Sequence, residues 1–133
     1  MQTGGPSQKC MSLTVKNRQT GNVTILDLNG RITLGDGAVV LRDAVKSAVG
    51  SGAHNVLLNL GGVTYIDSAG LGELVGSRAS AGNAGGNLKL LNLQKRVRDL
   101  LLITKLHTVF EVFEDEAAAV ASFGGAKGAD TGS

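Results

Sequence analysis

The 133-residue chain has little of several residue types that would point directly to a function. It has one proline, no tryptophan and only four other aromatic residues, so it offers few rings on which single-stranded nucleic acid could stack. Its single cysteine cannot form an internal disulfide, and no Cys/His cluster has zinc-site spacing. The formal net charge is only +2, and no apolar run approaches the ~18 residues of a membrane span. These absences argue against direct nucleic-acid, metal and membrane partners.

Glycine and small aliphatic residues dominate what is present. Twenty residues are glycine, about twice the usual share of ~7%, and hydrophobic residues make up 42% of the chain. A chain of this size and composition can bury an aliphatic core as one domain. We expect that domain to span residues 12–123. The small, polar segments 1–11 and 124–133 are expected to be a flexible leader and tail, and the absence of a signal peptide predicts a cytoplasmic protein.

Hydrophobic periodicity predicts an α/β fold. Two alternating runs, 13–15 and 23–28, predict an N-terminal antiparallel hairpin with a turn over 17–22. Further strands are expected at 56–60, closed by Gly61-Gly62, at 63–66, at 88–91 and at 109–113. Helices are expected from Asp36, as an N-cap, to Gly50 or Gly52, then over 68–81, 97–106 and 115–123. This alternation predicts a mostly parallel four- to five-stranded sheet with an antiparallel edge, packed against about four helices.

The segment 64–72, Thr-Tyr-Ile-Asp-Ser-Ala-Gly-Leu-Gly, is the most informative part of the chain because it places a hydroxyl where a strand ends and a helix begins. One interpretation makes Asp67 or Ser68 a helix N-cap. A second makes Gly70, Gly72 and Gly76 a nucleotide site, although their spacing departs from the dinucleotide fingerprint. A third makes Ser68 a hydrolase nucleophile, although Ile66 stands where that motif needs glycine.

The remaining titratable residues do not converge on catalysis. His54 and His107 are the only imidazoles, and neither has a local carboxylate partner in the sequence. The basic residues Lys95, Arg96, Arg98 and Lys105 could form an anion site, but they are expected instead as the solvated face and C-terminal dipole partners of the third helix. We therefore predict no enzyme activity and no cofactor.

The chain resembles the STAS domain family, and in particular its stand-alone bacterial members, the anti-sigma factor antagonists. The resemblance covers about residues 12–123. It rests on Gly30–Thr33, on the strands 56–60 and 90–93, on the signature Ile66–Gly72, and on the segment 97–113. It implies that Ser68 is phosphorylated by a partner anti-sigma factor that is a Ser/Thr kinase. It also implies that the unphosphorylated antagonist binds this kinase and frees the sigma factor, and that a phosphatase restores the unphosphorylated form.

Two positions depart from the family pattern. Thr33 stands where members often have an acid, and Ala69 stands where many have a second serine, which leaves Ser68 as the single phosphoacceptor of the motif. We expect a monomer or weak homodimer, with Leu71 pointing outward as the apolar anchor of the partner surface. The alternative is a STAS adaptor or ligand-sensing module in another signalling or lipid-transport assembly. The residues expected to contact the partner are Gly30, Arg31, Thr33, Asp67, Ser68, Ala69, Gly70, Leu71 and Gly72.

Overall fold

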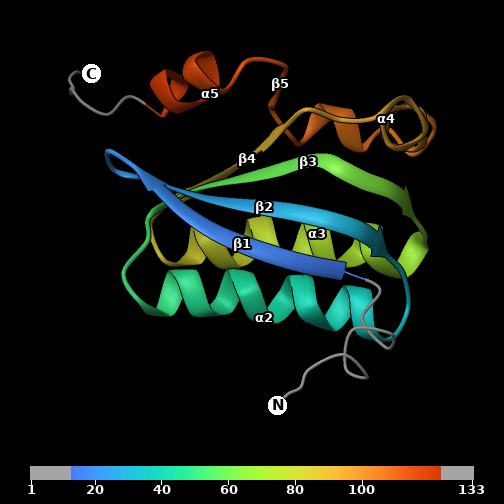
Figure 1. Cartoon of the computed structure of the whole chain (residues 1–133), viewed down its shortest axis with the longest axis horizontal. Helices are drawn as coiled ribbons and strands as arrows, with labels where there is room; N and C mark the ends of the chain where they lie inside the picture. The colour runs from blue at the N-terminus through green and yellow to red at the C-terminus, as the bar shows by residue number, and fades with distance from the viewer. Residues whose placement is uncertain (1–12, 124–133) are drawn as a thin grey trace.

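The computed structural model describes residues 13–123, which form a five-stranded sheet and four α-helices (Figure 1). The strand order follows the chain, β1-β2-β3-β4-β5, with β1 antiparallel to β2 and all other neighbours parallel. This confirms the mostly parallel sheet with one antiparallel edge. The strands are β1 (Leu13–Thr20), β2 (Val23–Ile32), β3 (Asn55–Ile66), β4 (Asn87–Leu91) and β5 (Val112–Phe113). The helices are α2 (Asp36–Gly50), α3 (Ser68–Asn83), α4 (Lys95–Ile103) and α5 (Glu116–Ser122), with a 3₁₀ turn at Leu106–Thr108.

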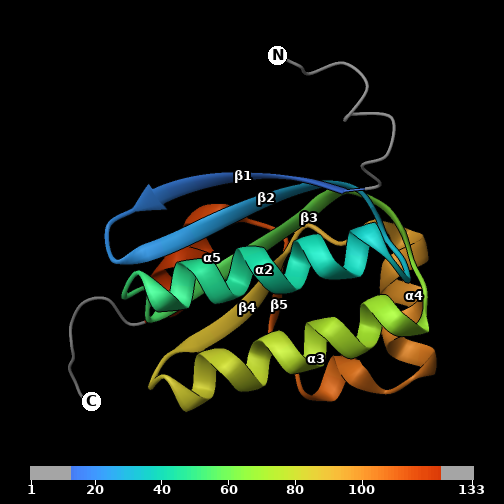
Figure 2. The same cartoon turned by 90° about the horizontal axis from the view of Figure 1, so that it is seen from below.

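Helices cover the sheet unequally. Figures 1 and 2 show α2 and α3 side by side across one face, with α5 on the opposite face. Both views also place α4 at the end of the molecule where α3 begins. The larger apolar core lies between the sheet and the helices α2 and α3, and Val97 and Leu101 of α4 contribute to it. One end of the sheet is therefore built from α3, α4 and the ends of the parallel strands.

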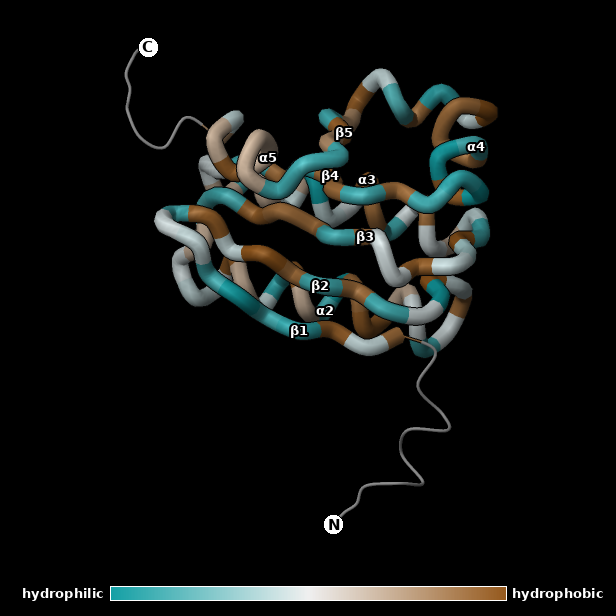
Figure 3. Tube along the Cα trace, turned by 45° about the horizontal axis from the view of Figure 1, so that its top comes forward, coloured by the Kyte–Doolittle hydropathy of each residue, from teal (hydrophilic) through white to brown (hydrophobic). Residues whose placement is uncertain are grey.

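The two faces of β2 show why the core has two parts. Leu26 and Leu28 belong to the larger core, whereas Val23 and Ile25 belong to a smaller cluster with Ala119 of α5. Successive strand residues point to opposite faces, so β2 must be apolar on both faces along the length that α5 covers. Figure 3 shows brown stretches along β2, broken by white and teal, beside the longer teal stretch of β1 at the sheet edge.

The sequence predicted that Gly61-Gly62 closes the strand at 56–60, but in the structure the strand continues through this pair. β3 runs without interruption from Asn55 to Ile66, and its register against β2 shifts between Asn59 and Gly62. A Cβ on Gly62 would overlap the side chain of Asn29 on the neighbouring strand. The pair therefore marks a β-bulge, where an extra residue is absorbed and the two backbones approach closely.

Three further boundaries differ from the predictions. The hairpin turn is confined to Gly21-Asn22, because residues 17–20 continue β1 in register with β2. The N-cap of α2 is Gly35, with φ of 97°, so Asp36 lies inside the first turn and is not the cap. The last strand is shorter than predicted and begins at Val112.

The basic residues of the α4 region, Lys95, Arg96, Arg98 and Lys105, are all exposed, as expected of a solvated face. Lys95 is the first residue of α4 and Arg96 the second, so both lie at the N-terminal end of the helix. Lys105 lies just beyond the C-terminal end. Of the four, only Lys105 is therefore placed as a C-terminal dipole partner.

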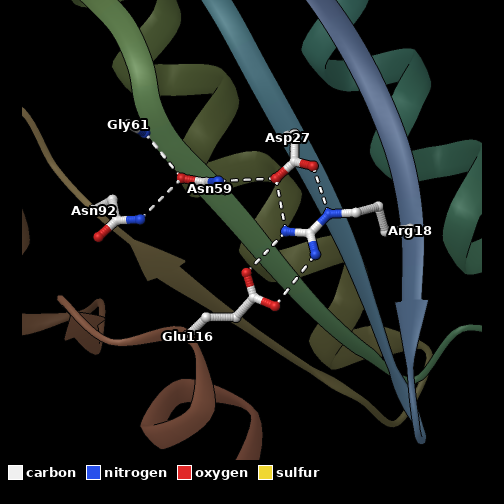
Figure 4. A network of polar contacts seen from close by, with 6 residues as sticks. All are labelled: Arg18, Asp27, Asn59, Gly61, Asn92 and Glu116. Carbon is white, nitrogen blue, oxygen red and sulfur yellow. Dashed lines mark hydrogen bonds and ion pairs between the residues drawn. The ribbon is translucent and has the colours of Figure 1, made fainter.

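A polar network ties α5 to the hairpin (Figure 4). The Arg18 guanidinium donates to Asp27 at 2.6 and 3.0 Å and to Glu116 of α5 at 2.9 and 3.2 Å. The hydrogen bonds from Arg18, together with one from Asn59 at 2.8 Å, hold the pKa of Asp27 below its ordinary value. This network of ion pairs and hydrogen bonds therefore joins α5 to the strands β1, β2 and β3.

Candidate functional site

The ends of β2 and β3 meet at the edge of the sheet where α3 begins. Ile32 and Ile66 are register partners, and the Asp67 amide donates to the Ile32 carbonyl at 3.3 Å. The Asp67 side chain reaches the next loop, where its Oδ2 accepts a hydrogen bond from the Leu34 amide at 2.9 Å. The segments 30–33 and 67–72, which the sequence analysis grouped together, are therefore direct neighbours.

Asp67 is the N-cap of α3. It has an extended backbone, and its Oδ1 accepts from the Gly70 amide at 2.9 Å, as expected of a carboxylate at this position. The hydrogen bond from Leu34, followed by that from Gly70, holds the pKa of the Asp67 carboxyl below its ordinary value. This carboxylate joins two loops and stays charged at neutral pH.

Ser68 is exposed and is the first residue of α3. Its hydroxyl lies at the positive end of a helix, where the backbone N–H groups of the first turn have no partners inside the helix. The Asp67 side chain accepts from Leu34 and Gly70, and it is not positioned as a base for the Ser68 hydroxyl by any hydrogen bond within residues 13–123. No hydrogen bond in this range therefore prepares the Ser68 hydroxyl as a hydrolase nucleophile.

No imidazole adjoins Ser68. His54 immediately precedes β3, whereas Ser68 follows the other end of that strand, and twelve strand residues span about 40 Å. His107 lies in the 3₁₀ turn after α4, and its ring nitrogen approaches the Leu101 carbonyl at 3.5 Å. A Ser/His pair of the hydrolase kind is therefore absent from residues 13–123.

Gly70 and Leu71 do not form the outward surface that the sequence suggested. A Cβ on Gly70 would overlap the Ile32 carbonyl oxygen, so glycine is needed there for close packing of α3 on the end of β2. Leu71 is 8% exposed and belongs to the larger core. The predicted anchor role of Leu71 is wrong, because the first turn of α3 directs this side chain inward.

Gly72 differs from Gly70 although both lie in the first two turns of α3. It is exposed, and a Cβ there would meet no heavy atom within 4 Å. The nucleotide interpretation required these glycines to cradle a phosphate. Gly70 instead serves packing, and its amide is already used by the Asp67 cap.

The most exposed apolar side chain beside the site is one that the sequence analysis did not select. Leu34 is 81% exposed and follows Arg31 and Thr33 in the segment that reaches Asp67. It lies between the end of β2 and the Gly35 cap of α2, a position that the sequence marks only as a leucine outside any periodic run. Within residues 13–123, no group of three or more His, Cys, Asp or Glu side chains could hold a metal ion. None of the described helices is long and apolar enough to cross a membrane.

The family model of the STAS domain matches residues 14–119. Among curated proteins, the anti-sigma-B factor antagonist of Bacillus subtilis is 33% identical over 102 residues, which cover 77% of this chain and 92% of that protein. Among solved structures, an anti-sigma factor antagonist from Mycobacterium paratuberculosis superposes with a TM-score of 0.75 at 20% identity, covering 84% of this chain and 94% of that one. The phosphorylated form of the Bacillus cell fate determinant SpoIIAA superposes with a TM-score of 0.63 at 19% identity, covering 82% and 98%.

These structures share the fold at low sequence identity, and the Bacillus subtilis relative extends the likeness to nearly its whole length. The family match includes both segments that meet at the edge of the sheet, 30–33 and 67–72. The chain belongs to the STAS domain family.

Proposed function

We propose that this protein is an anti-sigma factor antagonist controlled by phosphorylation of Ser68. In its unphosphorylated form it binds an anti-sigma factor that is a Ser/Thr kinase and thereby frees the sigma factor. The kinase phosphorylates Ser68, the complex separates, and a phosphatase restores the binding form. The observation that carries the proposal is an exposed serine on the first turn of α3, in a chain that is 33% identical to a named anti-sigma-B factor antagonist.

The free protein can accommodate a phosphate at Ser68 without unfolding. Phosphorylation adds about −1.5 to −2 charge, and a helix N-terminus stabilises an anion by about 0.3 to 1 kcal/mol. The neighbouring Asp67 carboxylate opposes this effect, but both of its oxygens already accept backbone hydrogen bonds. The fold of the phosphorylated protein should therefore match that of the unmodified one.

The same phosphate is costly in an interface. A dianion buried without a compensating partner costs about 3 to 5 kcal/mol, which corresponds to more than a hundredfold in affinity. Ser68 is exposed and flanked by the half-buried Asp67 and Ala69, so a partner that covers it must desolvate the phosphate. Phosphorylation then blocks binding locally, and no large conformational change is required.

The partner surface that we propose consists of residues that contact the partner and residues that keep those contact residues in position. The exposed or half-buried contact residues are Arg31, Thr33, Leu34, Ser68, Ala69 and Gly72. Gly30, with φ of 120°, shapes the end of β2. Asp67, Gly70 and Leu71 fix α3 against that strand. Leu34 replaces Leu71 as the apolar anchor.

This function is that of a regulatory binding protein and not of an enzyme. It needs no cofactor and no direct contact with nucleic acid or membrane, and it operates in the cytoplasm where sigma factors act. A monomer or weak homodimer suffices, because the proposed surface is contained in one chain.

The test is a phosphorylation assay with the purified anti-sigma factor kinase, with the modified residue mapped by mass spectrometry. We expect wild type and Ser47→Ala to be phosphorylated at Ser68 and Ser68→Ala to remain unmodified. Ser47 is the matched control because it is also an exposed helical serine, but it lies on α2. Equal phosphorylation of Ser68→Ala and wild type would show that the acceptor is elsewhere.

A further inference from the structure

A groove of about 460 Å³ lies between the end of β3 and α4. Five of its six lining residues belong to α4, and all six lie outside the signature Ile66–Gly72. Its strand residue, Tyr65, precedes Ser68 by three residues, and Figures 1 and 2 place α4 at the end of the molecule where α3 begins. The lining residues are Tyr65, Lys95, Arg96, Asp99, Leu100 and Ile103.

The groove exposes large apolar side chains that the core does not use. Ile103 is 76% exposed and Tyr65 is 39% exposed, whereas the buried face of α4 consists of Val97 and Leu101. Single exposed aliphatic residues are ordinary on protein surfaces. Here two helical residues, Leu100 and Ile103, and one strand residue line the same hollow, which is typical of a surface that binds another molecule.

The rim of the groove is basic in a place where the fold favours acids. Lys95 and Arg96 occupy the first turn of α4, next to the positive end of the helix dipole. Asp99 neutralises Lys95 at 2.9 Å, but Arg96 forms no ion pair within residues 13–123. Arg31, the register partner of Tyr65, is also without an ion pair in this range. Basic residues at the positive end of a helix lower its stability. Unfavourable residues of this kind, with no ion pair to offset them, are expected at functional surfaces.

We infer that this groove binds an acidic, amphipathic segment of the protein partner, with one apolar side chain between Tyr65 and Ile103 and carboxylates facing Arg96 and Arg31. The inference rests on the proposed function, because the partner is the anti-sigma factor kinase. Charge complementarity selects this occupant. The chain's own ends do not have the required composition, because residues 1–12 contain no acidic residue, and 124–133 contain one aspartate and no large apolar residue.

A folded protein segment fits the groove better than a membrane surface does. The groove is concave and carries a carboxylate, Asp99, among its three nearby cations. Segments that bind anionic membranes carry clusters of about four to eight Lys or Arg residues. A peptide segment instead needs a hollow for an apolar anchor and a few charges around it.

The groove also suggests how phosphorylation reaches beyond Ser68. Ser68 follows Tyr65 by three residues, which is at most about 10 Å of extended chain. A phosphate within about one Debye length of the groove repels the same carboxylates that the basic rim attracts. Phosphorylation therefore weakens the groove contact as well as blocking the contact at Ser68.

The test measures binding of the purified anti-sigma factor kinase by isothermal titration calorimetry. We expect Ile103→Ser to weaken binding about tenfold, as for the loss of an interface hot spot, while Leu102→Ser binds as wild type. Leu102 is the matched control because it is an exposed aliphatic residue of α4 that lines a different hollow. We expect Arg96→Glu to weaken binding more at low than at high ionic strength, and Lys46→Glu, with the same charge change on α2, to have no such effect. Circular dichroism verifies that each variant is folded.

The outcomes separate this inference from the proposed function. If Ser68→Glu abolishes binding while Ile103→Ser and Arg96→Glu bind like their controls, the groove inference is wrong and the proposed function stands. If Ser68→Glu binds as wild type, the proposed switch is wrong. Ile103→Ser and Arg96→Glu then still test whether the partner binds in the groove. Binding of wild type to vesicles of phosphatidylcholine and phosphatidylserine, lost in Ile103→Ser, would assign the groove to membranes and overturn the inference.

Discussion

Replacing Gly70 with alanine tests the packing that brings the two halves of the site together. Its Cβ would overlap the carbonyl oxygen of Ile32 and lie 2.8 Å from Cγ2 of Ile66. A backbone carbonyl in a paired strand cannot rotate away, so either α3 or the end of β2 must shift. Overpacking of this kind costs about 1 to 3 kcal/mol, and it exceeds the gain of up to about 1 kcal/mol that alanine brings to a helix.

Gly72→Ala is the matched control, since it makes the same substitution two residues later in the same helix. No heavy atom lies within 4 Å of the new Cβ, so only the helix preference remains, and α3 should gain about 0.5 to 1 kcal/mol. Because the helix preference is common to both variants, Gly70→Ala should be less stable than Gly72→Ala by the overpacking cost of about 1 to 3 kcal/mol.

The measurement is the free energy of unfolding in urea, followed by circular dichroism, with the slope of the transition compared among the three proteins. We expect Gly70→Ala to lower the midpoint and Gly72→Ala to raise it, with similar slopes. If both substitutions changed the free energy of unfolding equally, the contact between α3 and the end of β2 would not have the role assigned to it.

Three further predictions concern the supports of the site and of α5. Lys89 is 7% exposed, and its Nζ donates to the Ser122 carbonyl at 3.0 Å, so Lys89→Ala should destabilise the protein by about 1 to 3 kcal/mol in urea unfolding and Lys89→Met by less. The folded-state pKa values of Asp27 and Asp67 are lowered, so their stabilisation is complete above the unfolded value of 3.8 and is lost as pH falls through the lower folded values. Stability should therefore be flat from neutral pH to about 5 and fall below about 4, with a shallower fall in Asp67→Asn. Leu71→Ala should lower the free energy of unfolding by about 2 to 5 kcal/mol, while the folded fraction still binds the kinase, because Leu71 supports the surface from inside.

The order of helices and strands was predictable from the spacing of hydrophobic residues along the chain. The alternation of the hairpin and the helical spacing from Ser68 depend only on residues that lie near one another in sequence. A cap at Asp67 or Ser68 was predictable for the same reason, because an acid or serine before a helical run has a local function, and the structure selects Asp67.

Two of the errors involve partners that are distant in sequence. Gly61-Gly62 suggested a strand end, but the pair accommodates Asn29 of the neighbouring strand, which no local pattern reveals. Leu71 suggested a surface anchor, but its direction is set by how α3 packs on the sheet.

Lys95 and Arg96 lie at the N-terminal end of α4, where the helix dipole disfavours basic residues. The residues that break this local rule line the groove that we infer to be a binding surface. A sequence pattern alone shows such residues only as an exposed charged face. The groove becomes visible when the end of β3 is placed beside them.

The central claim is that one phosphate on Ser68 decides whether this protein binds its partner. It is tested most directly by titrating the purified anti-sigma factor kinase with the unmodified protein and with the protein phosphorylated at Ser68. We predict tight binding of the unmodified form, a more than hundredfold weaker affinity of the phosphorylated form, and the same circular dichroism spectrum for both. Equal affinity of the two forms for the kinase would contradict the account.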